Sequence, residues 1–444
     1  MNEIDQDLPD DEELEDDGLA PAEELDDRDF NPHRVPIGSW AKTLVEEAIR
    51  DVLAQEERKK TRVRARRAVD LKTFEHTVSA ILCDVVHRQL SDPGEWITVT
   101  FDKSVLGCGG RYRATALNTK LPDIVRALDA RRWIELEVGY HEHPFRQGRP
   151  SKQTRIRAGE TLTRLYTDNN TIRLSDYDLE DSEEVVILRR RRESHRDRGG
   201  DTDYPETEQT TRYREDLRRI NKALRDASLS FIGTGHNGRE VDLGDRRLRR
   251  IFNDGSFERG GRLYGGFWQG LKSEDRARGL RLNGQPTVTL DYGQTALRIL
   301  YGMAGIQPTW EDGYQVPGLE GHREGVKTLL NAMLNRDTPL QKFPKGVRQL
   351  FPRNTPAWQA VRLIETFHPP LKTKWRPRVG MELMFRESQI LVEVLLRLLD
   401  LKIVALPVHD ALIVSQANQG VTQELMLEVF HTHTSIEAKV GISR

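Results

Sequence analysis

Two periods of apolar residues run along the chain, one typical of helices and one typical of strands. Apolar side chains recur at helical spacing from Phe74 to Val86, whereas apolar and polar residues alternate from Trp96 to Phe101. The same two patterns predict further helices over 118–130, 213–228 and 381–399, and further strands over 132–138, 154–158, 286–291 and 401–415. Helices and strands are therefore mixed along the chain, which predicts an α+β fold.

The order of elements in the N-terminal half has a functional implication. The helix and strand over 118–138 are followed by a basic turn, Arg146 to Lys152, and by the short strand near 154–158. Helix, strand, basic turn, strand is the order of a winged helix, in which a helix enters a DNA groove and the wing contacts phosphates. Winged helices also act as protein-interaction modules, and the basic turn favours DNA contact over that alternative.

Composition divides the chain into four segments. Residues 1–35 are acidic, and a run of like charge with few aromatic or β-branched residues cannot bury enough surface to fold, so we expect a disordered tail. Residues 193–211 are hydrophilic and contain a Gly-Gly pair and a proline, which is typical of an interdomain linker. A helical plus winged-helix-like domain is then expected over 36–192, and a second domain over 212–444.

The composition also limits where the protein works. Its 444 residues are 37% hydrophobic and 31% charged, so the chain is more polar than an average globular protein. No segment holds about 18 uninterrupted apolar residues, and the N-terminus is acidic where a signal peptide is basic and then apolar. The cysteines, Cys83 and Cys108, are too few for a disulfide framework or a four-cysteine zinc site. We expect a cytoplasmic protein with no membrane partner.

The net charge of −2 hides an uneven distribution. Residues 1–29 hold 15 acidic residues and one basic residue, so the rest of the chain carries a net charge of +12. Two clusters, residues 58–67 and 189–198, are rich in basic residues and suit contacts with several phosphates each. A solvated helix face explains the first cluster equally well. The acidic tail either keeps the protein soluble or masks a basic groove until nucleic acid displaces it.

Two aspartates in the C-terminal half stand at predicted strand ends. Asp291 ends a strand before a sharp turn at Gly293, and His409 and Asp410 form the bend between two apolar strands. An aspartate at a strand end is commonly a solvent-facing residue, so neither acid alone indicates a site. If the strand that ends in Asp291 lies beside the hairpin, however, the two carboxylates converge. Such a pair suits two Mg²⁺ ions about 3.5–4 Å apart, which together support nucleotidyl transfer.

The sequence around these aspartates resembles known polymerase motifs. Residues 291–298 (DYGQTALR) are similar to motif A of the family A DNA polymerases and single-subunit RNA polymerases, and residues 408–410 (VHD) to motif C. Residues 323–327 (REGVK) are similar to the start of motif B, and residues 261–264 (GRLY) to the Gly-Arg-x-Tyr element of phage and mitochondrial RNA polymerases. Four motifs in the family's order are together fairly specific. The resemblance covers about residues 210–444 and implies a right-hand-like polymerase palm.

The resemblance also implies a role for each matched residue. Asp291 and Asp410 would hold two Mg²⁺ ions, or Mn²⁺, together with the backbone carbonyl of Tyr292. Arg323 and Lys327 would neutralise the incoming nucleoside triphosphate, and Lys327 would also protonate the pyrophosphate leaving group. Contacts to nucleotide, primer or template are implied for Ala296, Asn331, His409, Gln389, Arg262 and Tyr264. Without the other motifs, the Arg323 and Lys327 pair would indicate no more than an ordinary helix surface.

The chain departs from the family pattern at four positions. Ala296 stands where DNA-synthesising members have a Glu that blocks the sugar 2′-hydroxyl, and Ala411 stands where they have a further acid, so both favour ribonucleotide use. Asn331 and Asn335 replace the aromatic residues expected four and eight positions after the motif B lysine, which leaves the choice between dNTP and NTP open. The short interval between the two motif aspartates predicts reduced fingers.

Three functions are consistent with these residues. The favoured one is template-directed nucleotidyl transfer, by a DNA polymerase or a primase or RNA polymerase-like enzyme of DNA replication, with DNA or RNA as the template. The second is a replication initiator or regulator that binds DNA and whose polymerase-like domain is not catalytic. The third is an RNA-binding or regulatory protein in which the aspartates are incidental. The two aspartates separate the first function from the others, because only a polymerase needs both.

Overall fold

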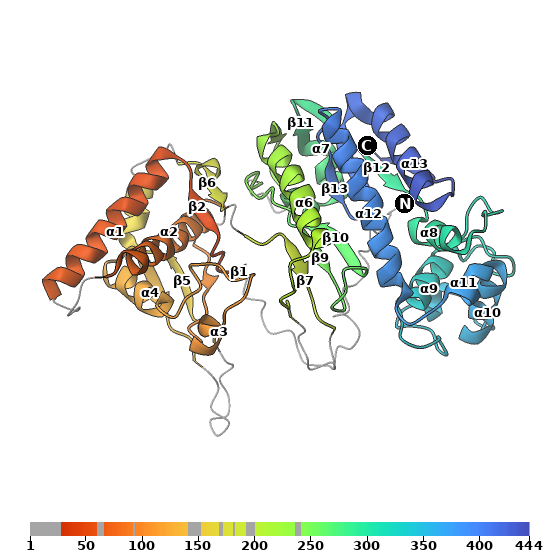
Figure 1. Cartoon of the computed structure of the whole chain (residues 1–444), viewed down its shortest axis with the longest axis horizontal. Coiled ribbons are helices and arrows are strands. Elements are labelled where there is room, and N and C mark those ends of the chain that lie inside the picture. The colour runs from red at the N-terminus through yellow and green to blue at the C-terminus, as the bar shows by residue number, and fades with distance from the viewer. Residues whose placement is uncertain are drawn as a thin grey trace, which may run out of the picture. The chain divides into compact units, whose positions relative to one another are not determined.

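The chain divides into two compact units. The structure, a computed structural model (Figure 1), describes residues 28–59, 66–91, 94–140, 152–167, 172–180, 183–191, 200–235 and 241–443. We call Leu300–Gly380 the insert unit, and Asp27–Ile299 together with Met381–Arg444 the main unit. Most of the predicted acidic tail, the middle of the first basic cluster, most of the second cluster and the predicted wing lie outside the described residues.

The N-terminal part of the main unit combines helices with a small sheet. Its elements are β1 (Arg28–Asp29), β2 (Arg34–Pro36), α1 (Ser39–Lys59), α2 (Ala68–Ser91), β3 (Ile97–Thr98), α3 (Lys103–Gly107), α4 (Leu121–Ala130), β4 (Ile134–Glu137), β5 (Arg155–Ala158), α5 (Glu160–Thr167) and β6 (Tyr177–Leu179). Four strands pair in the order β1-β3-β5-β4, and β2 pairs with β6. The apolar stripe of α2 supplies much of the core, including Phe74, Val78, Ile81, Leu82 and Val85.

This part follows the order of elements that the sequence predicted. The helices α2 and α4 and the strands β3, β4 and β5 overlap the predicted ranges, and β4 and β5 form an antiparallel pair. The connection that would be the wing falls on residues 141–151, outside the described residues. The winged-helix assignment and DNA contact by this region therefore stay predictions.

Residues 28–36 differ from the disordered tail predicted over residues 1–35. They form β1 and β2, and Phe30 is buried. The reason is Asp84 on α2, whose fully buried carboxylate accepts hydrogen bonds from Arg28 (2.8 and 3.0 Å) and Arg34 (3.2 Å). A buried carboxylate is costly unless it is paired and hydrogen-bonded, so these arginines bind the N-terminal strands to α2. The folded part of the chain thus includes residues that the composition alone assigned to the tail.

The C-terminal part of the main unit is built on two sheets. Its elements are β7 (Val186–Leu188), α6 (Glu208–Asp226), β8 (Leu229–Phe231), β9 (Arg249–Phe252), β10 (Gly260–Tyr264), α7 (Ser273–Gly279), β11 (Leu280–Leu282), β12 (Gln285–Tyr292), most of α12 (Val379–Asp400), β13 (Leu406–Val408), β14 (Ala411–Ser415), α13 (Gln419–Thr434) and β15 (Val440–Ser443). The larger sheet has the order β13-β14-β12-β11-β8, with β15 on β12, and all of its pairs are antiparallel. The smaller sheet has the order β10-β9-β7.

The structure differs from the predicted linker over 193–211 at its C-terminal end. Residues 192–199 lie outside the described residues, but Tyr204 is buried and α6 begins at Glu208. The Tyr204 hydroxyl donates a hydrogen bond to the carbonyl of Val186 (2.9 Å), and the guanidinium of Arg111 lies 3.6 Å from the centre of its ring. An aromatic anchor of this kind fixes a segment whose composition is otherwise typical of a loop. The C-terminal sheets also begin before the predicted linker, because β7 pairs with β9.

The insert unit is helical. It contains the end of α8 (Thr295–Ala304), followed by α9 (Arg323–Asn335), α10 (Ala357–Phe367) and α11 (Pro369–Lys374). The apolar face of α9 is buried through Val326, Leu329, Leu330, Met333 and Leu334. The chain as a whole therefore mixes α and β elements, as predicted, whereas a palm with reduced fingers stays a prediction. Among the described residues, no helix is both long and apolar enough to cross a membrane.

Candidate active site

The strand β12 carries the first candidate carboxylate at its C-terminal end. Its side chains alternate, so that Leu290 and Tyr292 are buried and Asp291 is exposed. The Tyr292 hydroxyl donates a hydrogen bond to the carbonyl of Met426 on α13 (2.7 Å), which fixes the end of the strand. Gln294 then takes a left-handed conformation (φ 62°), and α8 begins at the next residue. The strand end thus presents the Asp291 carboxylate to solvent beside a sharp turn.

The second candidate carboxylate lies in a tight hairpin. His409 and Asp410 form a two-residue turn, because Val408 on β13 pairs with Ala411 on β14. Every residue of both strands is buried, whereas His409 is exposed and has a φ of 54°. A left-handed conformation costs a residue other than glycine roughly 1–2 kcal/mol. Such strain persists only where the surroundings enforce it, and it is concentrated at functional sites.

The register of the large sheet brings the two aspartates to neighbouring positions. Asp291 on β12 is the pairing partner of Ala411 on β14, so Asp410 lies one residue along from the position directly opposite Asp291. Directly paired residues of antiparallel strands have Cα atoms roughly 4.5–5.5 Å apart. On its other side, Asp291 pairs with Gly441 of β15. The strand that ends in Asp291 therefore does lie beside the hairpin that carries Asp410.

One hydroxyl connects the two motifs. Thr295, the first residue of α8, has its Oγ1 2.8 Å from Oδ2 of Asp410 and 3.1 Å from the backbone carbonyl oxygen of Tyr292. Both oxygens lie within hydrogen-bonding distance of the same buried hydroxyl, so the Asp410 carboxylate and the Tyr292 carbonyl lie close together. Sequence reasoning did not select Thr295, although a hydroxyl residue within motif A, at the start of the helix that follows the strand, was a signal that could have found it.

These oxygen atoms suit a hard divalent cation. Carboxylate and carbonyl oxygens are the ligands that Mg²⁺ and Mn²⁺ prefer. Among the described residues, no group of three or more His, Cys, Asp or Glu side chains is placed to hold a metal ion. A closed protein cage is therefore not formed there. Mg²⁺ typically binds through one or two carboxylates and takes its other ligands from water and substrate phosphates, so Asp291, Asp410 and the Tyr292 carbonyl fit this ion.

A buried ion pair lies close to Asp410. Arg262 on β10 donates from Nε to Oε1 of Glu387 on α12 at 2.8 Å, and both side chains are largely buried. Burial raises the pKa of Glu387 to about 7, although the charge of Arg262 lowers it, and the charge of Asp410 raises it further. Asp410 and Glu387 also raise the pKa of Arg262 against the opposing effect of burial. Arg262 therefore has a buried partner, Glu387, that sequence reasoning missed, and its contact with nucleotide, primer or template stays a prediction.

Gln389 makes its contacts inside the protein. Its Oε1 accepts a hydrogen bond from the guanidinium of Arg250 (2.8 Å), and its Nε2 lies 3.4 Å from the hydroxyl of Tyr213. Arg250 is almost fully buried, and burial lowers its pKa to about 10. Gln389 is thus held by an arginine that the motif comparison did not identify. Tyr264 and Ala296, the two other predicted contact residues of the main unit, are both half-buried on β10 and α8.

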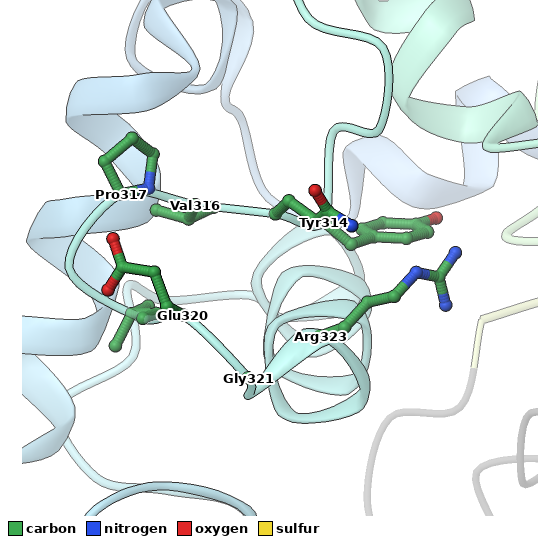
Figure 2. Close-up of a pocket in the computed structure, with 8 residues that line it drawn as sticks. Tyr314, Val316, Pro317, Glu320, Gly321 and Arg323 are labelled. Atoms are coloured by element: carbon green, nitrogen blue, oxygen red, sulfur yellow. The ribbon is translucent and has the colours of Figure 1, made fainter.

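The predicted triphosphate-binding residues lie on α9 of the insert unit. Arg323 and Lys327 are one turn apart and both are exposed. Arg323 donates to Asp312 (2.8 Å) and to Glu324 (2.7 Å), and its hydrogen bond to Asp312 raises the pKa of Arg323. Figure 2 shows its side chain next to Tyr314, whose ring centre is 5.3 Å from the guanidinium carbon. Arg323 and Tyr314 line a pocket of about 450 Å³ in the insert unit.

The two asparagines of α9 have a structural explanation. Nδ2 of Asn335 donates to the backbone carbonyl of Asn331 (3.1 Å), and a Cβ atom on Gly380 would lie 2.0 Å from Oδ1 of Asn335. The start of α12 therefore packs directly against the Asn335 amide at Gly380. Asn331 is half-buried one turn earlier.

Comparison with known proteins gives a weak structural likeness. No protein-family model matches the chain, and no curated protein matches it. Among solved structures, a match is found with the polymerase domain of Pol1 from M. smegmatis, described as a complex with a DNA primer-template and a dNTP. The two share 15% sequence identity and a TM-score of 0.29. The match covers 53% of this chain and 51% of the other, so the chain spans about half the length of that protein.

Proposed function

We propose that the protein is a template-directed nucleotidyltransferase that extends a DNA or RNA chain from nucleoside triphosphates. The observation that supports it best is the pairing of Asp291 with Ala411, which brings the first residue of motif A next to Asp410 of motif C. The hydroxyl of Thr295, which contacts both the Asp410 carboxylate and the Tyr292 carbonyl, adds to this support. The three proposed ligands lie on β12 and on the turn between β13 and β14 of one sheet, and Thr295 begins the helix that follows β12.

In the proposed reaction the residues of the chain bind and orient the reactants. Asp291 and Asp410 hold two divalent ions, with the Tyr292 carbonyl as a further ligand, and Thr295 fixes the Asp410 carboxylate by its hydrogen bond. When bound, the ions activate the attacking hydroxyl and stabilise the charge on the departing pyrophosphate. Arg323 and Lys327 neutralise the triphosphate, and Lys327 donates a proton to the pyrophosphate. His409, Gln389, Arg262 and Tyr264 contact primer, template or nucleotide.

The decisive experiment is extension of a primed template by the full-length chain in Mg²⁺ or Mn²⁺, with dNTPs and NTPs supplied separately. We expect Asp291→Ala and Asp410→Ala each to lower the rate at least about 100-fold, because each removes a ligand that stabilises developing charge. Asp400→Ala is the matched control, since this exposed acid pairs with Arg219 on the surface. Melting curves and DNA binding should stay close to wild type. Undiminished synthesis in either active-site variant would refute the proposal.

A second function is favoured by the asparagines of α9. Asn331 and Asn335 replace the rings that would stack on a nucleotide, and Asn335 is engaged with Asn331 and packed against Gly380. A DNA-binding initiator or regulator with a non-catalytic polymerase-like domain accounts for them directly. The same assay separates the two functions. DNA binding with no incorporation of either sugar type, in Mg²⁺ and in Mn²⁺, would favour the non-catalytic protein.

A further inference from the structure

Glu387 has no role in the motifs, yet it occupies a costly position. Its side chain is only 6% exposed, and it lies beside the negative charge of Asp410. Two carboxylates in one poorly hydrated region repel each other, and each loses hydration. Glu387 is nevertheless compatible with this position because Arg262 donates to it at 2.8 Å. The Glu387 carboxylate is costly to bury next to a proposed metal ligand. Its effect on the neighbouring side chains, Arg262 and Asp410, is therefore the feature to explain.

The helix α12, which carries Glu387, is held against β9 and β10 by hydrogen bonds of Arg250. Arg250 donates to the carbonyl of Gly261 (3.0 Å), to the hydroxyl of Ser388 (3.1 Å) and to the amide oxygen of Gln389 (2.8 Å). Gly261 has a φ of 81°, and a Cβ atom there would lie 2.9 Å from the Ser388 hydroxyl. The backbone of β10 therefore approaches α12 closely at the residue before Arg262. Glu387 is held at a fixed distance from Arg262 by its neighbours on both elements.

The Arg262 guanidinium acts electrostatically on two carboxylates. Both Glu387 and Asp410 raise its pKa, and Glu387 receives its hydrogen bond. Arginine binds carboxylates strongly and often through two parallel hydrogen bonds. If Glu387 carried no charge, Asp410 would be the remaining one of the two carboxylates whose charges act on this guanidinium. An arginine bound to Asp410 would compete with a divalent cation for the same oxygen atoms.

We propose that Glu387 is a positioning residue that holds the Arg262 side chain away from Asp410 and so keeps the Asp410 carboxylate available to a divalent cation. This inference rests on the proposed function, because it assumes that Asp410 is a metal ligand. Glu387 itself need not touch the metal or the nucleotide. Its effect is expected on cation affinity, which can be measured without any turnover.

The test is Mn²⁺ binding to the full-length chain, followed by electron paramagnetic resonance of the free ion in the absence of nucleotide. Glu387→Gln keeps the size of the side chain and an oxygen that accepts from Arg262, but removes the charge. We expect it to bind Mn²⁺ about tenfold more weakly than wild type, which corresponds to about 1.4 kcal/mol. In the double variant Arg262→Met with Glu387→Met, the competing guanidinium is gone, and we expect Mn²⁺ affinity to return to within about twofold of wild type.

A matched control lies on the same helix. Glu393 also pairs with an arginine and a histidine, Arg397 (2.5 Å) and His433 (2.6 Å), on the surface of α12. Glu393→Gln should leave Mn²⁺ affinity unchanged. If Glu387→Gln fails to fold, Glu387→Asp provides the test, since its carboxylate is one methylene shorter and holds Arg262 less well. It should bind Mn²⁺ more weakly than wild type, by a few-fold.

The outcomes separate this inference from the proposed function. If Asp410→Ala and wild type bind Mn²⁺ equally, Asp410 is not a metal ligand and the proposed function loses its basis. If Asp410→Ala abolishes binding but Glu387→Gln, or Glu387→Asp where the first variant does not fold, binds like wild type, Glu387 has no positioning role. Weak binding in Glu387→Gln that the double variant does not restore would also overturn the inference, because a merely structural defect would then explain it.

Discussion

At the scale of single residues, His368 shows how the surroundings of a side chain fix its charge. This histidine of the insert unit is fully buried. Its Nδ1 accepts a hydrogen bond from the hydroxyl of Tyr301 (2.9 Å), and its Nε2 donates one to the carbonyl of Gly313 (2.7 Å). Both bonds suit the neutral imidazole with its proton on Nε2, and a carbonyl and a phenol leave no acid to balance a positive charge. Burial accordingly lowers the pKa of His368 to about 4.

His368 predicts an acid-sensitive insert unit. The pKa in the fold is lower than the ordinary histidine value of about 6.5, so the unfolded chain binds more protons between pH 6.5 and 4. The contribution of neutral His368 to the free energy of unfolding is complete above about pH 6.5. It is lost as the pH falls to about 4, and the loss is up to about 3 kcal/mol. Urea unfolding at pH 7 and pH 4.5 should show that the unfolding free energy falls less on acidification in His368→Gln than in wild type. His431→Gln, at an exposed histidine, should lose as much as wild type.

At the scale of elements, the sequence predicted what depends on local pattern. The helices α2, α4, α6 and α12 and the strands β4, β12 and β14 overlap the predicted ranges, because each has an apolar period that one element buries. The hairpin turn at His409 and Asp410 was also predicted from two apolar runs with polar residues between them. These features are encoded within about 20 residues of sequence, so one sequence is enough to find them.

Features that depend on distant partners were missed. The strand β15 pairs with β12 beside Asp291, although it has only four residues and three of them are exposed. Glu387 was passed over because an acid within an amphipathic helix is usually solvated, and only the position of Arg262, 125 residues earlier, makes it a buried partner. Thr295 likewise gained significance only through Asp410. In each case the missing information was a contact between residues far apart in sequence.

The close approach of β10 to α12 yields a prediction about glycine. Gly261 combines a φ of 81° with a neighbour, the Ser388 hydroxyl, only 2.9 Å from the position of an added Cβ. Gly255 has a similar φ of 66° but no neighbouring atom within 4 Å, so it is a matched control. We expect Gly255→Ala to cost about 1 kcal/mol of unfolding free energy and Gly261→Ala about 2–3 kcal/mol.

Urea unfolding of the two glycine variants measures this difference. The additional loss of unfolding free energy in Gly261→Ala, compared with Gly255→Ala, reports the packing of β10 on α12, because backbone strain is common to both variants. Equal losses of unfolding free energy in the two variants would mean that α12 shifts to accept the added methyl group at no energetic cost. The hydrogen bonds of Arg250 would then not hold β10 and α12 rigidly together.

At the scale of the whole molecule, many of the basic residues are already paired with acids. Arg66, in the first basic cluster, donates to both oxygens of Glu56 (2.5 and 2.7 Å), and its guanidinium lies 4.0 Å from the centre of the Phe74 ring. Arg189, in the second cluster, pairs with Asp201 (3.4 Å). These described parts of the clusters contribute to the fold as well as to surface charge. The net charge of +12 outside residues 1–29 is therefore a better guide to attraction of nucleic acid than the density of arginine in any one run.

Removal of the acidic N-terminus should change nucleic-acid binding through charge alone. Deleting residues 1–27 removes 14 acidic residues and no basic ones, which shifts the net charge from −2 to +12. At about 50 mM salt we expect the deletion variant to bind duplex DNA roughly tenfold more tightly, with the difference shrinking as added salt screens the charges. Replacing the same 14 acids with Asn and Gln keeps the length and should have the same effect, as fluorescence anisotropy would measure. If the chain with Asn and Gln binds DNA like wild type while the deletion variant binds DNA more tightly, residues 1–27 weaken DNA binding by their bulk and not by their charge. If both bind like wild type, residues 1–27 do not mask the basic surface.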